Sequence, residues 1–372
     1  MKNIIDDKRE SGQLEGLVDE INSRSSRECE RWLALDKEMS LARAMGRGIN
    51  SFFRDYNKTR GEKKDLKEYV PAVMGGFYHY LSYAKYWDRK LDLEDPNTVK
   101  GSDATKAAKN SDTSDRWKLS VVILTKNEED KIRNCLESLK WVDEIVVVDG
   151  YSTDATVDIC RGYGAKVVQH RFEGNFGQER NIGIDNSSGD WVLQLDADEA
   201  VTEIFRVKML EILREKDSRY AAYKFMRKNF FMGHFMRYGG WYHHSHHLFR
   251  RGFARYEGRV HHQLIIDGEE AFLNADIEHN PFQSFTQLLA RQNRYTTLEA
   301  KEILEQRGRV NDDEVEYNIR KKPLKLFRKF YLKKQGFREG KHGFIFSVYF
   351  AWVHFLKWAK YWELCQKNGK IS

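Results

Sequence analysis

The fold is decided by the stretch LSVVILTKNEE, residues 119–129, in which an apolar, β-branched run passes directly into polar and acidic residues. Comparable apolar runs occupy residues 144–148, 165–168 and 191–195. A helical pattern of apolar residues lies between the run at 119–124 and the run at 144–148. This alternation predicts an α/β fold with a mostly parallel sheet flanked by helices. Because ligands of such sheets bind beyond the carboxyl ends of the strands, the polar residues after each run are the first candidates for chemistry.

Three of the four apolar runs end in a polar cluster, at residues 125–129, 149–154 and 196–199. Carboxylates gathered at one sheet edge repel each other, so a cation or a hydrogen-bonding ligand is expected to compensate them. A Mg²⁺ or Mn²⁺ ion that holds a diphosphate would do so. Asp196 and Asp198 would point to the same side of an extended segment and share one ion, whereas a turn would separate them.

The chain divides by composition into four segments. Residues 1–94 carry helical apolar patterns, and residues 95–117 form a polar linker with almost nothing apolar near its centre. Residues 118–300 form the predicted catalytic domain, and residues 301–372 a helical tail rich in basic and aromatic residues. The four cysteines are scattered, and the first residues lack the apolar core of a secretory signal, so we expect a cytoplasmic protein.

An internal repeat links the two ends of the chain. The segment His79–Trp87 matches His354–Trp362, and the same register pairs Tyr56 with Tyr331 and Gly61 with Gly336. We interpret the N-terminal segment as a duplicated or fused copy of the C-terminal helical tail. Two similar amphipathic helices that arose independently are the alternative.

The four motifs of the catalytic segment, taken in order, resemble those of the family-2 glycosyltransferases of GT-A fold. They are Leu124–Glu128, Val148–Thr156, Phe176–Asn181 and Leu195–Glu199. The similarity is greatest to bacterial lipopolysaccharide-core β-glucosyltransferase-like members, on the evidence of Leu248–Arg251, Arg259–His261, Asn293–Thr297 and the aromatic tail. The resemblance covers roughly residues 119–364, and the extension before it departs from the usual family layout.

The resemblance implies a metal-dependent, inverting transfer of a sugar from a nucleotide-diphosphate donor, expected to be a UDP-sugar. It implies that Asp198 is the main metal ligand and that Asp196 lies near the ribose or the metal. A basic guanidinium would clamp the donor phosphates. The implied donor-binding residues are Thr125, Asn127 and Glu128 around the base and ribose, Asp149 on the base, Ser152 and Asp154 beside the diphosphate, and Arg180 as the clamp.

The catalytic base is not assigned by the motifs. Where many family members carry a carboxylate, this chain has His243-His244 after a Gly-Gly-Trp segment and His261-His262 after a valine. An imidazole titrates near neutrality, so His244 or His262 is a candidate base, and His261 or His247 a candidate metal ligand. A structural or surface role is the alternative for each histidine. The remaining carboxylate candidates for the base are Glu199, Glu257 and Asp267.

The net charge of +7 favours acidic partners, and Glu339 and Glu363 are the only acids between residues 321 and 372. The apolar part of residues 343–364 is shorter than the roughly 20 residues of a spanning helix. It predicts either a helix on an anionic membrane surface or one packed against the protein. The expected acceptor is a glycolipid or a lipopolysaccharide core at the inner face of the membrane, and no nucleic acid is expected.

Three other functions are alternatives to this one. A processive polysaccharide synthase would carry transmembrane stretches and a Gln-x-x-Arg-Trp motif, and a sugar nucleotidyltransferase would carry a glycine-rich phosphate loop near its N-terminus. Neither motif occurs in the sequence. A basic binding protein for membranes or nucleic acid, built on a GT-A-like scaffold without catalysis, is the alternative of a different class. It leaves the carboxylate clusters unexplained.

Overall fold

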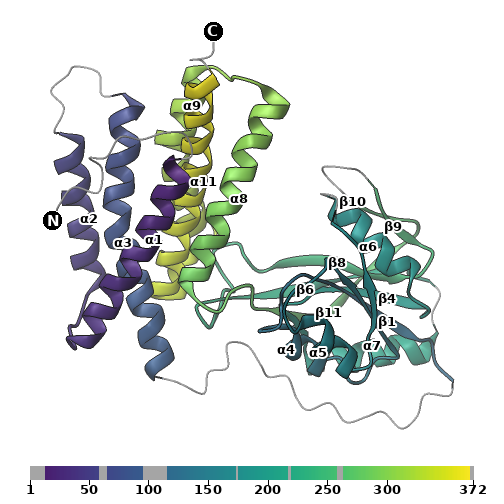
Figure 1. Ribbon diagram of the computed structural model, residues 1–372. Helices are drawn as coiled ribbons and strands as arrows, with labels where there is room; N and C mark the ends of the chain where they lie inside the picture. Colours follow the sequence, from purple (N-terminus) through teal and green to yellow (C-terminus); the bar gives the residue numbers. More distant parts are fainter. Residues whose placement is uncertain are drawn as a thin grey trace. The chain divides into compact units, whose positions relative to one another are not determined.

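The computed structural model describes residues 13–57, 65–94, 115–172, 175–216, 219–257 and 263–368. The chain forms two compact units (Figure 1). Unit 1 consists of residues 1–98 and 282–372, and unit 2 consists of residues 99–281. The two ends of the chain therefore fold together, and helix α8 (Phe285–Arg307), most of which falls inside the predicted catalytic segment 118–300, packs in unit 1.

Unit 2 is built on a nine-stranded sheet with the order β3-β2-β1-β4-β8-β6-β11-β5 and with β7 paired to β6. Strands β9 and β10 form a separate hairpin. The strands are β1 (Leu119–Thr125), β2 (Glu144–Asp149), β3 (Lys166–Gln169), β4 (Trp191–Asp196), β5 (Glu199–Val201), β6 (Ala222–Phe231), β7 (His234–Phe235), β8 (His243–Arg250), β9 (Ala254–Glu257), β10 (Gln263–Ile266) and β11 (Glu270–His279). The helices are α4 (Ile132–Glu137), α5 (Thr156–Gly162), α6 (Phe176–Asp185) and α7 (Glu203–Glu215).

The predicted α/β class is confirmed in unit 2. Strands β1 to β4, which are the four apolar runs, pair in parallel, whereas β8 joins β4 and β6 antiparallel. Alternate side chains of β1 enter different cores, because Val121 belongs to the cluster that includes Leu136 and Phe205, and Val122 to the cluster that includes Ile184. Helices therefore cover both faces of the sheet.

Helix α6 approaches β1 closely because it carries a glycine at the contact. A Cβ atom on Gly183 would lie 2.1 Å from Cγ1 of Val122 and 3.3 Å from Cγ2 of Val148. Any larger residue would push α6 away from the sheet. The N-terminal part of α6 carries Arg180, so this contact also sets the position of that guanidinium over the sheet.

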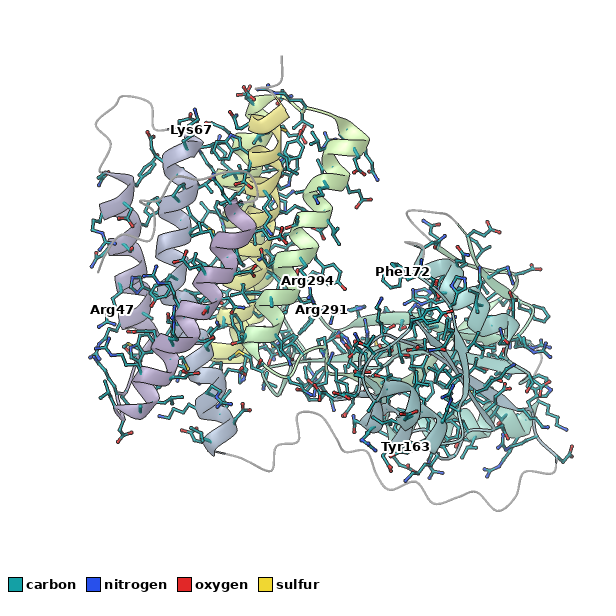
Figure 2. The ribbon with its side chains drawn as sticks, in the orientation of Figure 1. Arg47, Lys67, Tyr163, Phe172, Arg291 and Arg294 are labelled. Carbon is teal, nitrogen blue, oxygen red and sulfur yellow. The ribbon has the colours of Figure 1, made fainter. Side chains whose placement is uncertain are left out.

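All of the regular secondary structure described in unit 1 is helical. Helices from the N-terminal and C-terminal parts of the chain lie side by side in it (Figure 1). In Figure 2, Arg47 and Lys67 on the N-terminal helices and Arg294 on α8 belong to the exposed faces of their helices. The elements other than α8 are α1 (Gln13–Ala34), α2 (Leu41–Tyr56), α3 (Leu66–Glu94), α9 (Asp312–Glu316), η1 (Tyr317–Lys321), α10 (Lys322–Arg328), η2 (Lys329–Lys333), η3 (Gly336–Glu339) and α11 (Gly340–Asn368).

The apolar C-terminal segment is the packed helix α11. Tyr349, Leu356 and Tyr361 are fully buried, and the Tyr349 hydroxyl donates to the Leu288 carbonyl of α8 at 3.3 Å. The packing alternative of the sequence analysis is therefore the observed one for these side chains. Across the residues that the structure describes, none of the helices combines the length and the apolar character needed to cross a bilayer.

Among the described residues of unit 1, two lysines are buried, Lys85 and Lys360, and each donates to neutral oxygens. Lys85 Nζ lies 2.5 Å from both the carbonyl and the side-chain oxygen of Asn22, and burial lowers its pKa to about 7 from 10.5. A lowered pKa means that the unfolded chain binds the extra proton between pH 7 and pH 10.5. The stability due to this group is therefore fully present above pH 10.5, decreases as the pH falls, and is lost by about pH 7.

We expect Lys85→Met to remove this pH dependence. The free energy of unfolding of the wild type should rise between pH 7 and pH 9 relative to that of the variant, as measured by urea unfolding at each pH. Arg47→Met, which changes an exposed cation of the same unit, is the control and should keep the wild-type slope. Parallel curves for Lys85→Met and the wild type would contradict the assignment.

Candidate functional site

The polar clusters after β1 and β2 meet at one edge of the sheet. The strand register places Thr125 beside Asp149, and the Thr125 hydroxyl donates to Asp149 Oδ1 at 3.3 Å. One step further, the Asn127 N–H donates to the Ser152 hydroxyl oxygen at 2.8 Å. The meeting follows from parallel pairing, because parallel strands end at the same edge.

Asp149 is the centre of this edge. Its carboxylate is fully buried and accepts hydrogen bonds from the Ser152 N–H at 3.0 Å, the Ser152 hydroxyl at 2.5 Å and the Gln169 amide at 3.1 Å. Burial by itself would raise the pKa of Asp149, but the donors from Ser152, Gln169 and Thr125 outweigh it and lower the pKa. The carboxylate is thus held ionised and in a fixed orientation.

The two loops are joined by reciprocal contacts. Asn127, at φ +54°, has a left-handed backbone that asparagine tolerates, and its side-chain oxygen accepts the Thr153 N–H at 2.8 Å. Glu129 accepts the Ala155 N–H at 2.8 Å, while Asp154 accepts the Glu129 N–H at 3.3 Å. The polar residues of both loops are therefore positioned before any ligand binds.

The acidic triplet begins where β4 ends. Asp196 is the last residue of β4, a turn follows at residues 197–198, and β5 begins at Glu199. The condition under which both aspartates would point the same way, an extended strand, is therefore not met, because the chain turns there. The Asp196 carboxylate is 42% exposed and lies 3.4 Å from the Arg180 guanidinium and 3.3 Å from that of Arg227.

Asp198 and Glu199 lie deeper than Asp196. The Asp198 side chain is 9% exposed, and its Oδ1 lies 3.4 Å from Nε2 of His279 at the end of β11. The Glu199 side chain is 3% exposed, accepts the Asp196 N–H at 2.8 Å and lies 2.5 Å from Nε of Arg227. Burial raises the pKa of Glu199 to about 8, Arg227 opposes this rise, and the charges of Asp196 and Asp198 add to it.

Arg180 lies in a cationic and aromatic setting above the sheet. Its guanidinium carbon is 5.5 Å from the ring centre of Tyr256, and the Tyr256 hydroxyl donates to Gln194 at 2.5 Å. His247 of β8 is part of the same group: burial, followed by the charge of Arg180, lowers its pKa to about 4, while Asp196 opposes this shift. His247 is therefore neutral at pH 7.

The structure thus brings the predicted residues into two neighbouring groups. The first holds the β1 and β2 loops, and the second surrounds the acidic triplet together with Arg180; the register that sets Leu124 opposite Asp196 makes the two groups adjacent. Among the base candidates, Glu199 is buried in the second group, and His244 is exposed, with its ring 5.3 Å from that of Phe272. His261 and His262 lie outside the described residues.

Arg227, His279 and Gln169 are site residues that the sequence analysis did not identify. Each lies on a strand, and two of them, Gln169 and His279, are the last residues of β3 and β11. A search for polar residues at the ends of further strands would have found these two. Arg227 lies inside β6, and only the pairing of distant strands brings it to Glu199.

No group of three or more histidine, cysteine or acidic side chains in the described ranges is arranged as a ready-made metal cage. Mg²⁺ and Mn²⁺ do not require one, because one or two carboxylates and the phosphate oxygens of a substrate complete the shell. The charges of Asp196 and Asp198 add to the rise in the pKa of Glu199, so an added cation is compatible with this cluster.

Comparisons with known proteins give one family. Residues 120–264 match the model of glycosyl transferase family 2. An uncharacterized glycosyltransferase of Rickettsia bellii is 30% identical in an alignment of 263 residues, and the match covers 66% of this chain and 87% of the relative. The lipopolysaccharide core biosynthesis glycosyltransferase LpsC of Rhizobium meliloti is 27% identical in an alignment of 255 residues, and the match covers 66% of this chain and 92% of the relative.

Among solved structures, S. aureus TarS 1-349 in complex with UDP-GlcNAc is 16% identical, and the match covers 68% of this chain and 92% of the TarS chain. Its TM-score is 0.35, and at that value the likeness assigns no residue of this chain a role.

Proposed function

Because this chain belongs to glycosyl transferase family 2 and has the GT-A fold, we propose that it moves a sugar from a nucleotide-diphosphate donor to a lipopolysaccharide-core or other glycolipid or glycan acceptor, with inversion at the sugar. The observation that carries this proposal is the meeting of the β1, β2 and β4 polar clusters at one edge of the parallel sheet. That edge is where α/β sheets bind nucleotides.

The donor, proposed to be a UDP-sugar, would place its base and ribose against the loops after β1 and β2. Thr125, Asn127 and Glu128 would line this pocket, with Asp149 as the acceptor for a base N–H. Ser152 and Asp154 are already hydrogen-bonded within the loops, so we propose that they hold the shape of the diphosphate side. Arg180 would turn from Asp196, at 3.4 Å, to the phosphate oxygens, since a guanidinium pairs well with phosphate.

We propose that Asp198 holds a Mg²⁺ or Mn²⁺ ion, with Asp196, which the turn at residues 197–198 sets apart from it, and His261 as further candidate ligands. The bound ion would stabilise the leaving diphosphate. The hard oxygen donors of the two carboxylates suit either ion. Arg227 competes with an ion for Asp196, at 3.3 Å, so Asp198 is the stronger candidate.

In the reaction, the acceptor hydroxyl oxygen forms a bond to the anomeric carbon of the sugar while the bond from that carbon to the diphosphate oxygen breaks. A protein base takes the hydroxyl proton. Glu199 is less suited to this step, because it is buried, ion-paired with Arg227 and has a pKa of about 8. We therefore propose that Glu199 positions Arg227 and the Asp196 backbone and that His244 or His262 is the base.

The acceptor proposal is supported by the similarity to LpsC, whose name gives lipopolysaccharide core biosynthesis as its role. The net charge of +7 is favourable for an acceptor carrying phosphate groups or lying in an anionic membrane surface. We propose that the protein acts at the cytoplasmic face of the inner membrane through exposed basic residues, without insertion of α11.

The test is sugar transfer by the full-length protein over a panel of nucleotide sugars, each with Mn²⁺, Mg²⁺ or excess chelator. We expect turnover of one nucleotide sugar to exceed the others, with UDP-sugars the first to test, and chelation to abolish it. Fluorescence titration with the free nucleotide diphosphates gives a second readout that does not depend on the acceptor. Failure of every donor to bind, with or without metal, would overturn the proposal.

A further inference from the structure

The two ends of the chain form equivalent lysine sites in unit 1. In the register that matches His79–Trp87 with His354–Trp362, Lys85 corresponds to Lys360. Lys85 donates to the carbonyl and side-chain oxygens of Asn22. Lys360 donates to the same two atoms of Asn293, and both of these Lys360 distances are 2.6 Å.

Both lysine side chains also contact hydroxyl groups one turn further along α1 or α8. Ser26 lies at 2.9 Å from Lys85, and Thr296 and Thr297 lie at 3.0 Å and 2.8 Å from Lys360.

The contacts between the two copies are reciprocal. The Asn22 amide of α1 donates to the Thr286 carbonyl of α8 at 3.3 Å, and the Asn293 amide of α8 donates to the Glu15 carbonyl of α1 at 2.9 Å. The equivalence of Asn22 and Asn293 also makes Glu15 and Thr286 equivalent. Exchange of the two copies therefore leaves this pair of contacts unchanged, as in the isologous interface of a two-fold dimer.

The helix ends repeat this reciprocity. The first N–H groups of an α-helix have no partner within the helix, so an acid from elsewhere can satisfy one of them. Asp88 of α3 accepts the Phe285 N–H at the start of α8, at 2.8 Å. Glu363 of α11 accepts the Leu14 N–H at the start of α1, at 3.1 Å. Asp88 corresponds to Glu363, and Leu14 to Phe285, in the registers already given.

One aromatic pair marks the centre of the interface. Phe77 and Trp352 are equivalent in the repeat, and their rings stack on each other with centroids 4.3 Å apart and planes 3° apart. In a two-fold interface, the residue that touches its own equivalent is the one nearest the axis. Around them, Leu81 of α3 and its equivalent, Leu356 of α11, are both fully buried.

We propose that α1–α3 take the place of a second chain: they cover, within one molecule, a self-complementary face of α8 and α11 through which two copies of this protein would otherwise pair. The face is apolar at its centre, and an apolar surface left open to water favours association. A partner of this face must accept a hydrogen bond from the Asn293 amide and from the first N–H groups of α8, and it must pack against the Trp352 ring. A second copy of α8 and α11 carries groups equivalent to those of α1–α3, so it can make the same contacts in both directions.

The lengths of relatives are consistent with this proposal. An uncharacterized glycosyltransferase of Rickettsia typhi is matched over 90% of its length by 68% of this chain, so about a third of this chain has no counterpart in that alignment. The linkage also has an energetic consequence. A copy attached to the same chain is present at an effective concentration set by the connecting residues 95–284, and this favours internal pairing over pairing between chains at low protein concentration.

The test is the mass of full-length variants by light scattering over a concentration series. Phe77→Lys places a charge in the internal interface but leaves the α8–α11 face intact, so we expect its mass to double from 44.0 kDa with rising concentration. The wild type should stay at the mass of one chain. Trp352→Lys, the same change at the equivalent position, alters the face that both pairings use, and it should remain a single chain.

Two results would overturn the proposal. One is a folded Phe77→Lys protein that stays at the mass of one chain, as Trp352→Lys does; the other is a wild type that is already a dimer. If the lysine prevents folding, as circular dichroism would reveal, Phe77→Ala is the gentler change, because it removes the stacked ring without adding a charge. A folded Phe77→Ala that never dimerises would equally refute the idea. In any dimer, hydrogen exchange should stay slow in α8 and α11.

Discussion

Replacement of Asp198 by asparagine is expected to lower sugar transfer by about a thousand-fold at saturating Mn²⁺, because Asp198 is the proposed metal ligand. Several kcal/mol of transition-state stabilisation by a metal would depend on this ligand, and each 1.4 kcal/mol is about tenfold in rate. An amide is close to a carboxylate in size, so packing beside His279, which lies 3.4 Å from Asp198 Oδ1, should be preserved. The measurement is transfer rate against Mn²⁺ concentration, for variant and wild type.

The matched control is Asp185→Asn. Asp185 is a 53% exposed carboxylate at the end of α6, paired with Arg255 at 2.8 Å and outside the acidic triplet. Its loss should leave both the rate and the Mn²⁺ dependence unchanged. Binding of Mn²⁺ together with a nucleotide diphosphate, measured by calorimetry, separates a metal role from a catalytic one. Equal rates for folded Asp198→Asn and the wild type would remove Asp198 from the metal site.

Replacement of Arg227 by methionine is expected to lower the free energy of unfolding by about 3 kcal/mol or more above the Glu199 pKa of about 8, where the change leaves a buried, ionised carboxylate without its cation. Glu199 is 3% exposed and lies 2.5 Å from the Arg227 guanidinium, which also lies 3.3 Å from Asp196. Methionine keeps much of the packing of the arginine stem, so the change removes mainly the positive charge. Urea unfolding at pH 9, where Glu199 of the wild type is ionised, measures the effect.

Arg255→Met is the control for the arginine change. Arg255 forms an ion pair with Asp185, and both side chains are more than half exposed, so its loss should cost less than about 1 kcal/mol. A double variant, Arg227→Met with Glu199→Gln, removes the buried charge together with its cation and should recover part of the stability. If Arg227→Met proves no more harmful than Arg255→Met, the buried ion pair does not stabilise unit 2.

The sheet and its polar edge could be predicted from the sequence because both depend on local patterns. Apolar runs such as residues 119–124 specify buried strands wherever they pack, and the polar residues directly after them must then lie at the strand ends. The proposed donor residues Thr125 and Asp149 lie side by side for this reason. The family and the GT-A fold followed from four such motifs in order.

The conformation of the acidic triplet, residues 196–198, could not be predicted from local sequence patterns. The sequence Asp196-Ala197-Asp198 is compatible with a strand or a turn, and only the antiparallel pairing of β5 with β11 required the chain to turn there. That pairing brings His279 to Asp198, and the pairing of β6 with β8 and β11 brings Arg227 to Glu199. No spacing in the sequence encodes contacts between residues so far apart along the chain.

In unit 1, the presence of related helical segments at the two ends of the chain could be inferred from the amino-acid sequence, because the residues around Lys85 match those around Lys360. Their packing against each other, with Phe77 stacked on Trp352, is known from the folded structure alone. A repeat records similar local chemistry, whereas an interface depends on which apolar faces meet after the chain has folded.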